Sequence, residues 1–311
     1  MSTINIDQLI CLLGEKDKRA FAKALSIVEN KEKGAIEILN YAYRNLSDKA
    51  LIVGITGPGG AGKSTLVDKV IKHFRLKGKK VGVIAVDPSS PYTGGAFLGD
   101  RIRMSNHSTD SHVYIRSFAN RGAMGGISNS TKNVLYLYKS FDFDVIIVES
   151  LGIGQDETEI TNFVDVTVVT VVPGFGDSIQ MAKAGMQEIA DIFVINKADK
   201  PDAEEYYQQM LASLAMIPDE IRPVILKTIA TNDTGVDELV EQVCIVGQKN
   251  WAKRDKKTIA RVKAEIRTEL IYLMEINLAK LVDFLSEKVF KGEASPFEVS
   301  QDIYEHINFK L

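Results

Sequence analysis

Residues 51–65 read LIVGITGPGGAGKST, and this stretch decides the fold. It joins a short apolar strand to a complete G-x-x-x-x-G-K-S/T motif, and the STLVDKVIKHF sequence that overlaps its end is typical of a helix. Glycines let backbone N–H groups turn toward phosphate oxygens, and the start of the next helix favours anions. Lys63 is expected to reach the β- and γ-phosphates, and Ser64 to ligate Mg²⁺. The residues predicted to cradle the phosphates are Gly57, Gly59, Gly60, Ala61, Gly62, Lys63, Ser64 and Thr65.

Six short runs rich in β-branched residues alternate with helical stretches over the middle of the chain. They read LIVGIT, VGVIAV, VIIVE, VTVVTVV, IFVIN and PVILKT. Each run is almost wholly apolar, as expected for strands buried on both faces. Strands separated by helices imply right-handed crossovers and a parallel sheet. The chain is therefore predicted to be an α/β protein of the P-loop NTPase fold, with a mostly parallel central sheet flanked by helices.

Glycine and proline divide the chain into three regions. Residues 1–48 lack proline, contain only two glycines and show helical spacing, which predicts an N-terminal helical extension. Residues 49–247 form the predicted P-loop domain. Residues 248–311 are predicted to form a C-terminal helical arm, because apolar residues from Ile259 to Phe284 recur at steps of three and four. We expect this stripe to pair with a second copy, although packing on the chain's own P-loop domain is the alternative.

Composition excludes several classes of protein. The chain has 311 residues, 45% of them hydrophobic and 25% charged, which is an ordinary globular balance. The net charge is −3, so no overall attraction to nucleic acid or to an anionic membrane is expected. Neither a signal peptide nor an apolar run of about 18 residues is evident. With two cysteines far apart, the protein is expected in a reducing compartment, the cytoplasm.

A second motif predicts that the base is guanine rather than adenine. Asn196, Lys197 and Asp199 belong to the NKAD sequence that ends the strand IFVIN. An Asp199 carboxylate would accept hydrogen bonds from guanine N1–H and the 2-amino group, a donor pair that adenine lacks. Asn196 would fix the loop and Lys197 would lie over the base. A backbone N–H for the base oxygen is expected within Thr228, Ile229 and Ala230.

Carboxylates near the ends of the parallel strands predict a Mg²⁺ site together with Ser64. Asp87 ends one strand, Glu149 ends another, and Asp100 lies further along from Asp87. The alternative for each is a turn former or helix cap, most plausibly for Asp87, which precedes proline. The N–H of Gly152 is expected to sense the γ-phosphate.

The remaining catalytic and switch candidates rest on weaker patterns. Arg103 is a candidate for neutralising phosphate charge, whereas Arg101 is as readily a solvated side chain. Gln155 is a candidate for orienting water. Few residues suit a general base, which predicts slow hydrolysis that a partner stimulates. The catalytic candidates are therefore Lys63, Asp87, Asp100, Arg103, Glu149 and Gln155. Asp177 and Lys183 are candidates for a further switch loop, although their segment could equally be an ordinary connection between a strand and a helix.

With these motifs assembled, the chain resembles the MeaB/ArgK family of P-loop GTPases. The resemblance rests on GITGPGGAGKST, AVDPSSPYTGGAFLGDRIRM, RSFANRGAMGGIS, VIIVESLGIGQDETEI, VVPGFGDSIQMAKAG and NKAD. It implies a metallochaperone GTPase that gates adenosylcobalamin loading of a B12-dependent acyl-CoA mutase, usually methylmalonyl-CoA mutase, and protects or reactivates that enzyme. It also implies GTP, GDP and Mg²⁺ as ligands and a homodimer formed through the C-terminal arm.

The same resemblance assigns roles to individual residues. Asp87 and Asp100 match switch carboxylates linked to Mg²⁺, Glu149 a strand-end acid, and Arg103 a switch arginine. Asp177 with Lys183 matches a further switch loop. Two departures stand out: ESLG replaces the common ETVG, and Ser178 follows the loop aspartate where an acidic residue is frequent.

Three other functions are alternatives to this one. A nickel-insertion GTPase usually carries Cys and His ligands, but only His107 and His112 lie near each other here, without a cysteine. A scaffold that binds GTP without turnover conflicts with the complete set of Lys63, Ser64 and carboxylates. A transport-associated kinase lacks support, because no kinase catalytic loop is present.

Overall fold

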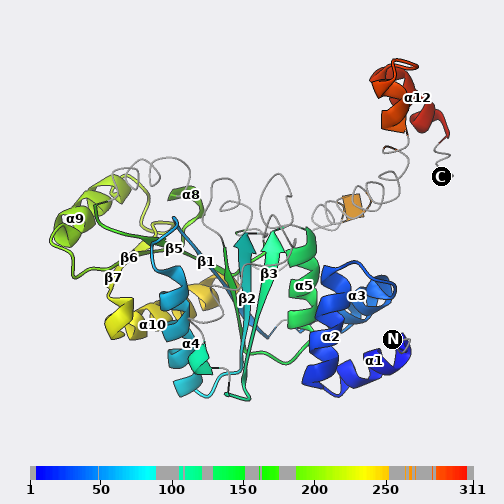
Figure 1. Ribbon diagram of the computed structural model, residues 1–311. Coiled ribbons are helices and arrows are strands. Elements are labelled where there is room, and N and C mark those ends of the chain that lie inside the picture. The colour runs from blue at the N-terminus through cyan, green and yellow to red at the C-terminus, as the bar shows by residue number, and fades with distance from the viewer. Residues whose placement is uncertain are drawn as a thin grey trace. The chain divides into compact units, whose positions relative to one another are not determined.

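The protein is described by a computed structural model (Figure 1). It describes residues 5–47, 49–88, 105–107, 109–120, 129–150, 161, 163–174, 187–251, 263, 266–267, 270, 282 and 285–306. The chain divides into two compact units, Met1–Asp255 and Lys256–Leu311. None of the helices described is long and apolar enough to cross a membrane.

The first unit is built on a sheet in which all the described strands run parallel. Seven strands lie in the order β3-β2-β4-β1-β5-β6-β7. Their bounds are β1 Leu51–Thr56, β2 Val81–Pro88, β3 Val113–Asn120, β4 Val145–Glu149, β5 Val166–Val171, β6 Ile192–Asn196 and β7 Val224–Thr228. The chain crosses from β4 over β1 to β5, so β1 is the switch point at which a parallel sheet opens a ligand crevice.

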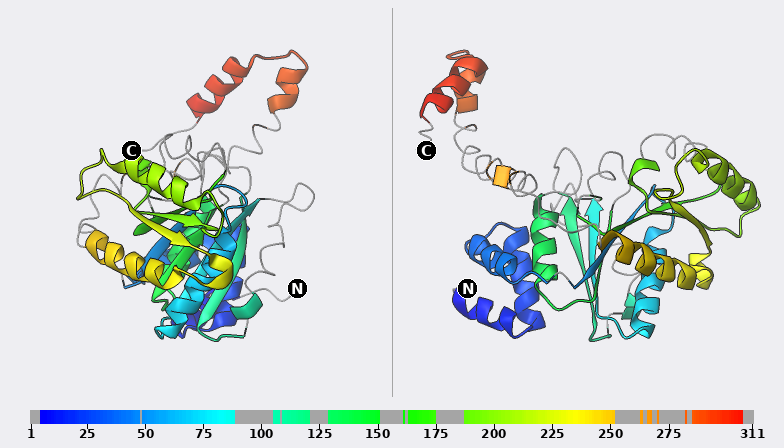
Figure 2. Two further views of the ribbon diagram at one scale, coloured as in Figure 1. Left: turned by 90° about the vertical axis from the view of Figure 1, so that its left-hand side faces the viewer. Right: turned by 180° about the vertical axis from the view of Figure 1, so that it is seen from behind.

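Helices cover both faces of the sheet (Figures 1 and 2). The helices described in this unit are α1 Ile6–Gly14, α2 Lys18–Glu29, α3 Ala35–Arg44, α4 Lys63–Leu76, α5 Asn129–Lys139, α8 Gln187–Ile189, α9 Ala203–Leu214 and α10 Val236–Trp251, with 3₁₀ turns Ser105–His107 and Ala230–Asn232. Val53 and Ile55 of β1 pack with α4 and α10, while Ile52 packs with α5 and the N-terminal helices. Burial on both faces explains why these strands are apolar throughout.

All six predicted strands are present, and the prediction of a mostly parallel α/β fold is confirmed. A seventh strand, β3, was not predicted; among the described strands it pairs with β2 alone, at the edge of the sheet. Its sequence VYIRSFAN carries an arginine within the strand. Arg116 points to α2, where it donates hydrogen bonds to the Ala22 carbonyl (3.0 Å) and to Glu29 (2.8 Å). An edge strand with a charged residue lacks the all-apolar pattern of the central strands, which is why the pattern failed there.

The N-terminal helices are part of the first unit's core. Phe21 of α2 is fully buried. Its ring stacks on Phe141 with a centroid separation of 4.1 Å and meets Tyr138 edge-on at 5.2 Å. Helix α2 is capped by Asp17, whose side chain accepts a 2.7 Å hydrogen bond from the N–H of Ala20.

Within the second unit, helix α12 spans Pro296–His306 and begins with a capping box. Ser295 accepts from the N–H of Glu298 at 3.1 Å, and Glu298 accepts from the N–H of Ser295 at 2.7 Å. Most of the predicted apolar stripe lies outside the described residues. Ile266 and Leu270 of that stripe are described, and each is 55% exposed within this single chain.

Candidate nucleotide site

The phosphate loop leaves β1 at its carboxyl end and needs glycine at two positions for steric reasons. Gly57 has φ +135°, and a Cβ there would lie 2.0 Å from the carbonyl oxygen of Thr170. Gly62, the N-cap of α4, has φ +87°, and its Cβ would lie 2.5 Å from Nδ2 of Asn196. Apart from the adjoining residues, no atom of the described part of the chain lies within 4 Å of a Cβ built on Gly59 or Gly60. The loop is therefore fastened at both ends, while its middle leaves backbone open to a ligand.

Lys63 is the first residue of α4, and its side chain is folded over the loop. The residue is only 8% exposed. Its ammonium group donates hydrogen bonds to the carbonyl oxygens of Gly57 (2.7 Å) and Pro58 (3.2 Å). A buried cation at a helix N-terminus gives this loop a strongly positive character, which suits phosphate oxygens.

Ser64 and Glu149 meet beneath the loop. The Ser64 hydroxyl donates a 2.8 Å hydrogen bond to Oε1 of Glu149, and both residues are buried. Glu149 ends β4, which pairs with β1 so that Ile55 and Glu149 are partners in the register. The next residue, Ser150, donates from its hydroxyl to that of Thr56 at 2.7 Å. A hydroxyl and a carboxylate side by side are oxygen donors of the kind that Mg²⁺ prefers.

Asn196 joins the NKAD segment to the phosphate loop. Its amide nitrogen donates to the carbonyl of Ala61 at 2.9 Å. Its amide oxygen accepts from the Thr228 hydroxyl and from the N–H of Ala230, each at 3.1 Å. One buried side chain therefore holds together three segments: the phosphate loop, the end of β6 and the turn after β7.

The other members of the predicted base site lie around Asn196. Lys197 has φ +57°, and its ammonium group donates to the carbonyl of Gly60 at 3.0 Å. Asp199 is exposed, and Ile229 is half-buried. Ala198 and Ile229 line one pocket of about 240 Å³ at the carboxyl ends of β6 and β7.

The sequence did not predict a group of polar contacts behind the NKAD segment, in which Asp233 meets Lys72 and His73; we call it the polar brace. Asp233 has φ +62° and accepts a 2.6 Å hydrogen bond from Lys72, and its other oxygen lies 2.8 Å from Nε2 of His73. Burial by itself would raise the pKa of Asp233, but the hydrogen bonds from Lys72 and His73 outweigh it and hold this pKa below its ordinary value. The polar brace connects the turn after β7 to α4, and no sequence motif predicts it.

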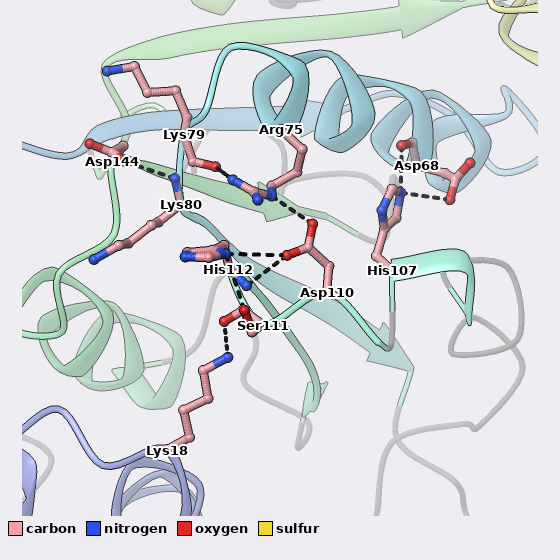
Figure 3. A network of polar contacts seen from close by, with 10 residues as sticks. All are labelled: Lys18, Asp68, Arg75, Lys79, Lys80, His107, Asp110, Ser111, His112 and Asp144. Carbon is pink, nitrogen blue, oxygen red and sulfur yellow. Dashed lines mark hydrogen bonds and ion pairs between the residues drawn. The ribbon is translucent and has the colours of Figure 1, made fainter.

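A second contact to α4 comes from His107, close to the end of the 89–104 segment (Figure 3). Its Nε2 lies 3.0 Å from the carbonyl oxygen of Asp68 and 3.2 Å from Oδ1 of the same residue. Because a carbonyl oxygen only accepts, Nε2 carries a proton. Asp68 lies one turn beyond Ser64 on α4, so this contact anchors the chain near the phosphate loop.

The structure brings together Lys63, Ser64, Glu149 and Asn196 at the carboxyl edge of the sheet. The backbone of Asp87 lies one residue before the end of β2 at that same edge, but its side chain is not described. Among the described residues, no three His, Cys, Asp or Glu side chains gather in a group that could hold a metal ion. Six predicted site residues lie outside the described residues: Asp100, Arg103, Gly152, Gln155, Asp177 and Lys183.

Comparison with known proteins identifies the family of this chain. A family model described as methylmalonyl Co-A mutase-associated GTPase MeaB matches residues 21–284. A Pyrococcus horikoshii protein named as a GTPase is 42% identical over 315 residues, covering 97% of this chain and 98% of the relative. A fused isobutyryl-CoA mutase of Cupriavidus metallidurans is 38% identical over 200 residues, covering 62% of this chain and 18% of that protein.

Among solved structures, the chain resembles one titled LAO/AO transport system kinase. The TM-score is 0.65 at 23% sequence identity, and the match covers 98% of this chain and 99% of the other. This likeness confirms the fold. The family model and the relatives go further: the chain belongs to the methylmalonyl Co-A mutase-associated GTPase MeaB family, and it is a P-loop GTPase that binds guanine nucleotide.

Proposed function

We propose that this GTPase serves a B12-dependent acyl-CoA mutase, with methylmalonyl-CoA mutase as the first-choice client. In this role it gates the loading of adenosylcobalamin and protects or reactivates the mutase. The observation that carries the proposal is the match to the fused isobutyryl-CoA mutase, in which a segment 38% identical to this chain occupies 18% of the polypeptide. A segment similar to this GTPase within a mutase polypeptide supports a separate chain of the same family acting on a separate mutase.

The reaction converts GTP and water to GDP and phosphate. The buried Lys63 would be the main positive charge that the protein supplies to it. Lys63 and the N-terminus of α4 would offset charge on the β- and γ-phosphates. Bound Mg²⁺ would supply further charge neutralisation at these oxygens. The Ser64 hydroxyl and Glu149 carboxylate fit such an ion, and Asp87 and Asp100 are proposed to complete its surroundings.

The other site residues complete the proposal. Asp199 would select guanine, while Asn196 and Lys197 hold the base segment against the phosphate loop. Gly152 and Arg103 would respond to the γ-phosphate, and Gln155 would orient the attacking water. Asp177 and Lys183 would report the nucleotide state to the client.

A hydrolysis assay with purified mutase tests the client. We expect slow GTP hydrolysis by the protein alone and a several-fold rise on adding methylmalonyl-CoA mutase. Adding mutase to Lys63→Ala protein assigns the stimulated rate to this chain, because that variant should stay inactive. Isobutyryl-CoA mutase in a parallel arm distinguishes the two clients. A measurable rate that no B12-dependent mutase changes would retain the GTPase and reject the client.

The C-terminal arm is proposed to form a homodimer. Ile266 and Leu270, one helical turn apart, are each 55% exposed in the single chain, which leaves apolar surface for a partner helix. We expect a dimer mass by light scattering for the full chain and a monomer mass for the Ile266→Glu/Leu270→Glu variant. The same mass for both proteins would contradict dimerisation through this stripe.

A further inference from the structure

A second cavity lies at the edge of the sheet opposite the phosphate loop. It has a volume of about 210 Å³, and its wall includes Leu51 and Val145, the first residues of β1 and β4. The phosphate loop leaves β1 at the other end, so the length of this strand, roughly 20 Å, separates the two places. The cavity is therefore distinct from the nucleotide site.

The inner wall of this cavity is apolar and firmly packed. Phe74 is 2% exposed, and Gly247 brings α10 so close to β1 that a Cβ there would lie 2.5 Å from Cδ1 of Leu51. Trp251, at the end of α10, lines the cavity and is 38% exposed. An indole and a phenyl ring in one small cavity suit an aromatic ring or a short acyl chain.

The rim of the cavity is positively charged. Lys49, Lys77 and Lys79 line it, and all three are exposed. Within the described part of the chain, none of their ammonium groups forms a hydrogen bond or an ion pair. Among the described residues of the rim there is one carboxylate, Asp144, and it accepts a 2.7 Å hydrogen bond from the N–H of Lys80.

The network around Lys79 fixes its backbone and leaves its ammonium group available. Arg75 donates to the Lys79 carbonyl at 2.6 Å and pairs with Asp110 at 2.7 Å. Figure 3 shows the Lys79 side chain extending away from this pair. The fold thus fixes where the Lys79 side chain begins, and no counter-ion among the described residues pairs with its ammonium group.

The cavity wall includes the thiol of Cys244, and the charges of Lys77 and Lys79 affect the pKa of this thiol. Burial raises the pKa of Cys244 and the negative charge of Glu241 adds to the rise, while the positive charges of Lys77 and Lys79 oppose it. Lys77 and Lys79 line the same cavity as Cys244, so their charges can act on a group bound inside it.

We propose that this cavity binds a small amphiphilic anion. Its ring or short acyl chain would lie against Phe74 and Trp251, and its carboxylate or phosphate group would lie between Lys77 and Lys79. The described lining residues set three cations against one carboxylate, which disfavours a cationic ligand, and the volume limits the apolar part to about one ring.

The protein carries its own probe of this site, because Trp251 is the one tryptophan in the sequence. Tryptophan fluorescence of the full chain is followed while benzoate, phenyl phosphate or neutral benzamide is added. We expect a saturable change with at least one anion and binding of benzamide that is weaker by about tenfold or more. The stronger of the two anions identifies the preferred head group.

Two variants tie the signal to the cavity. The Lys77→Gln/Lys79→Gln protein should bind the preferred anion about tenfold more weakly, whereas Lys23→Gln, at an exposed lysine of α2, should bind it as the wild type does. GTP hydrolysis at wild-type rate confirms that both variants are folded. The proposal is overturned by the absence of a saturable change, by equal binding of benzamide, or by unchanged binding in the double variant.

Discussion

Ser64 and Glu149, 85 residues apart in the chain, are joined by a 2.8 Å hydrogen bond in the buried floor of the candidate nucleotide site. The bond links the first turn of α4 to the end of β4. A hydroxyl and a carboxylate held in this way form a preorganised pair of oxygen donors, so little reorganisation is needed when a cation binds. Changes to either residue should therefore affect cation dependence before they affect the fold.

Ser64→Ala should increase the Mg²⁺ concentration needed for half-maximal GTP hydrolysis by about tenfold or more, because the hydroxyl ligand is lost. A Mg²⁺ titration of the hydrolysis rate measures this. Ser64→Thr is the matched control, since it keeps the hydroxyl and the motif allows either residue. An identical Mg²⁺ requirement in all three proteins would remove Ser64 from the cation site.

Lys63→Ala should reduce GTP hydrolysis by at least about 100-fold, because it removes the cation that the fold buries against the phosphate loop. The rate of phosphate release at saturating GTP measures the effect. Lys69→Ala, on the same helix and further from the loop, should hydrolyse GTP nearly as the wild type does. Retained activity in Lys63→Ala would refute the phosphate-loop assignment.

Asp199→Asn should weaken GTP binding and favour xanthosine triphosphate. The amide presents a donor where the carboxylate offered an acceptor, and xanthine has the complementary oxygen in place of the 2-amino group. Competition between the two nucleotides for the wild type and the variant gives the specificity ratio. An unchanged preference for guanine would show that the NKAD segment does not read the base.

Asn196→Ala should lower the free energy of unfolding by about 2–3 kcal/mol, because the buried N–H of Ala230 and carbonyl of Ala61 lose their partner. Guanine nucleotide affinity should fall with it. Urea unfolding and nucleotide titration measure the two effects. Asn45→Ala, at an exposed helix end, should change stability by less than about 1 kcal/mol; a similar loss in both variants would contradict the special role of Asn196.

Asp233 predicts a specific dependence of stability on pH. Its pKa in the folded state lies below the ordinary value of 3.8, so the ionised carboxylate stabilises the fold above that pH. This contribution is lost as the pH falls through the depressed folded pKa. Asp233→Asn should therefore be less stable than the wild type by about 1 kcal/mol at neutral pH.

The difference between wild type and Asp233→Asn should shrink as the pH falls below 3.8, where the wild-type carboxylate becomes protonated. Urea unfolding across a pH series measures it. Asparagine tolerates the left-handed backbone at this position, which isolates the effect of charge. A stability gap that does not change with pH would exclude the ionised carboxylate as its source.

The central strands and the phosphate loop were predictable because a local pattern determines them. Burial on both faces makes β1 and β4 apolar throughout, and phosphate binding requires glycines at fixed spacing before Lys63. Strand β3 was not predicted, because its edge position allows Arg116 to face α2 and this charged residue breaks the all-apolar pattern. Its stability depends on a helix about 90 residues earlier in the chain, which no local window contains.

The other features that could not be predicted from the sequence are contacts between segments far apart in the chain. NKAD predicts a base site, but not that Asn196 also holds Ala61 of the phosphate loop. The pairing of Asp233 with Lys72 and His73 likewise depends on how the turn after β7 lies against α4. Short polar residues of this kind are common in any loop, so only the folded chain distinguishes them.

The packing of Phe21 against Phe141 has a consequence for how the protein is made. A ribosome adding about 5–20 residues each second needs roughly 6–24 s to pass from one residue to the other. During that time α2 has already emerged, yet the aromatic partner of its most buried ring has not been synthesised. The first helices must therefore wait for the middle of the sheet, and nascent chains halted before residue 141 should expose Phe21 to chaperones.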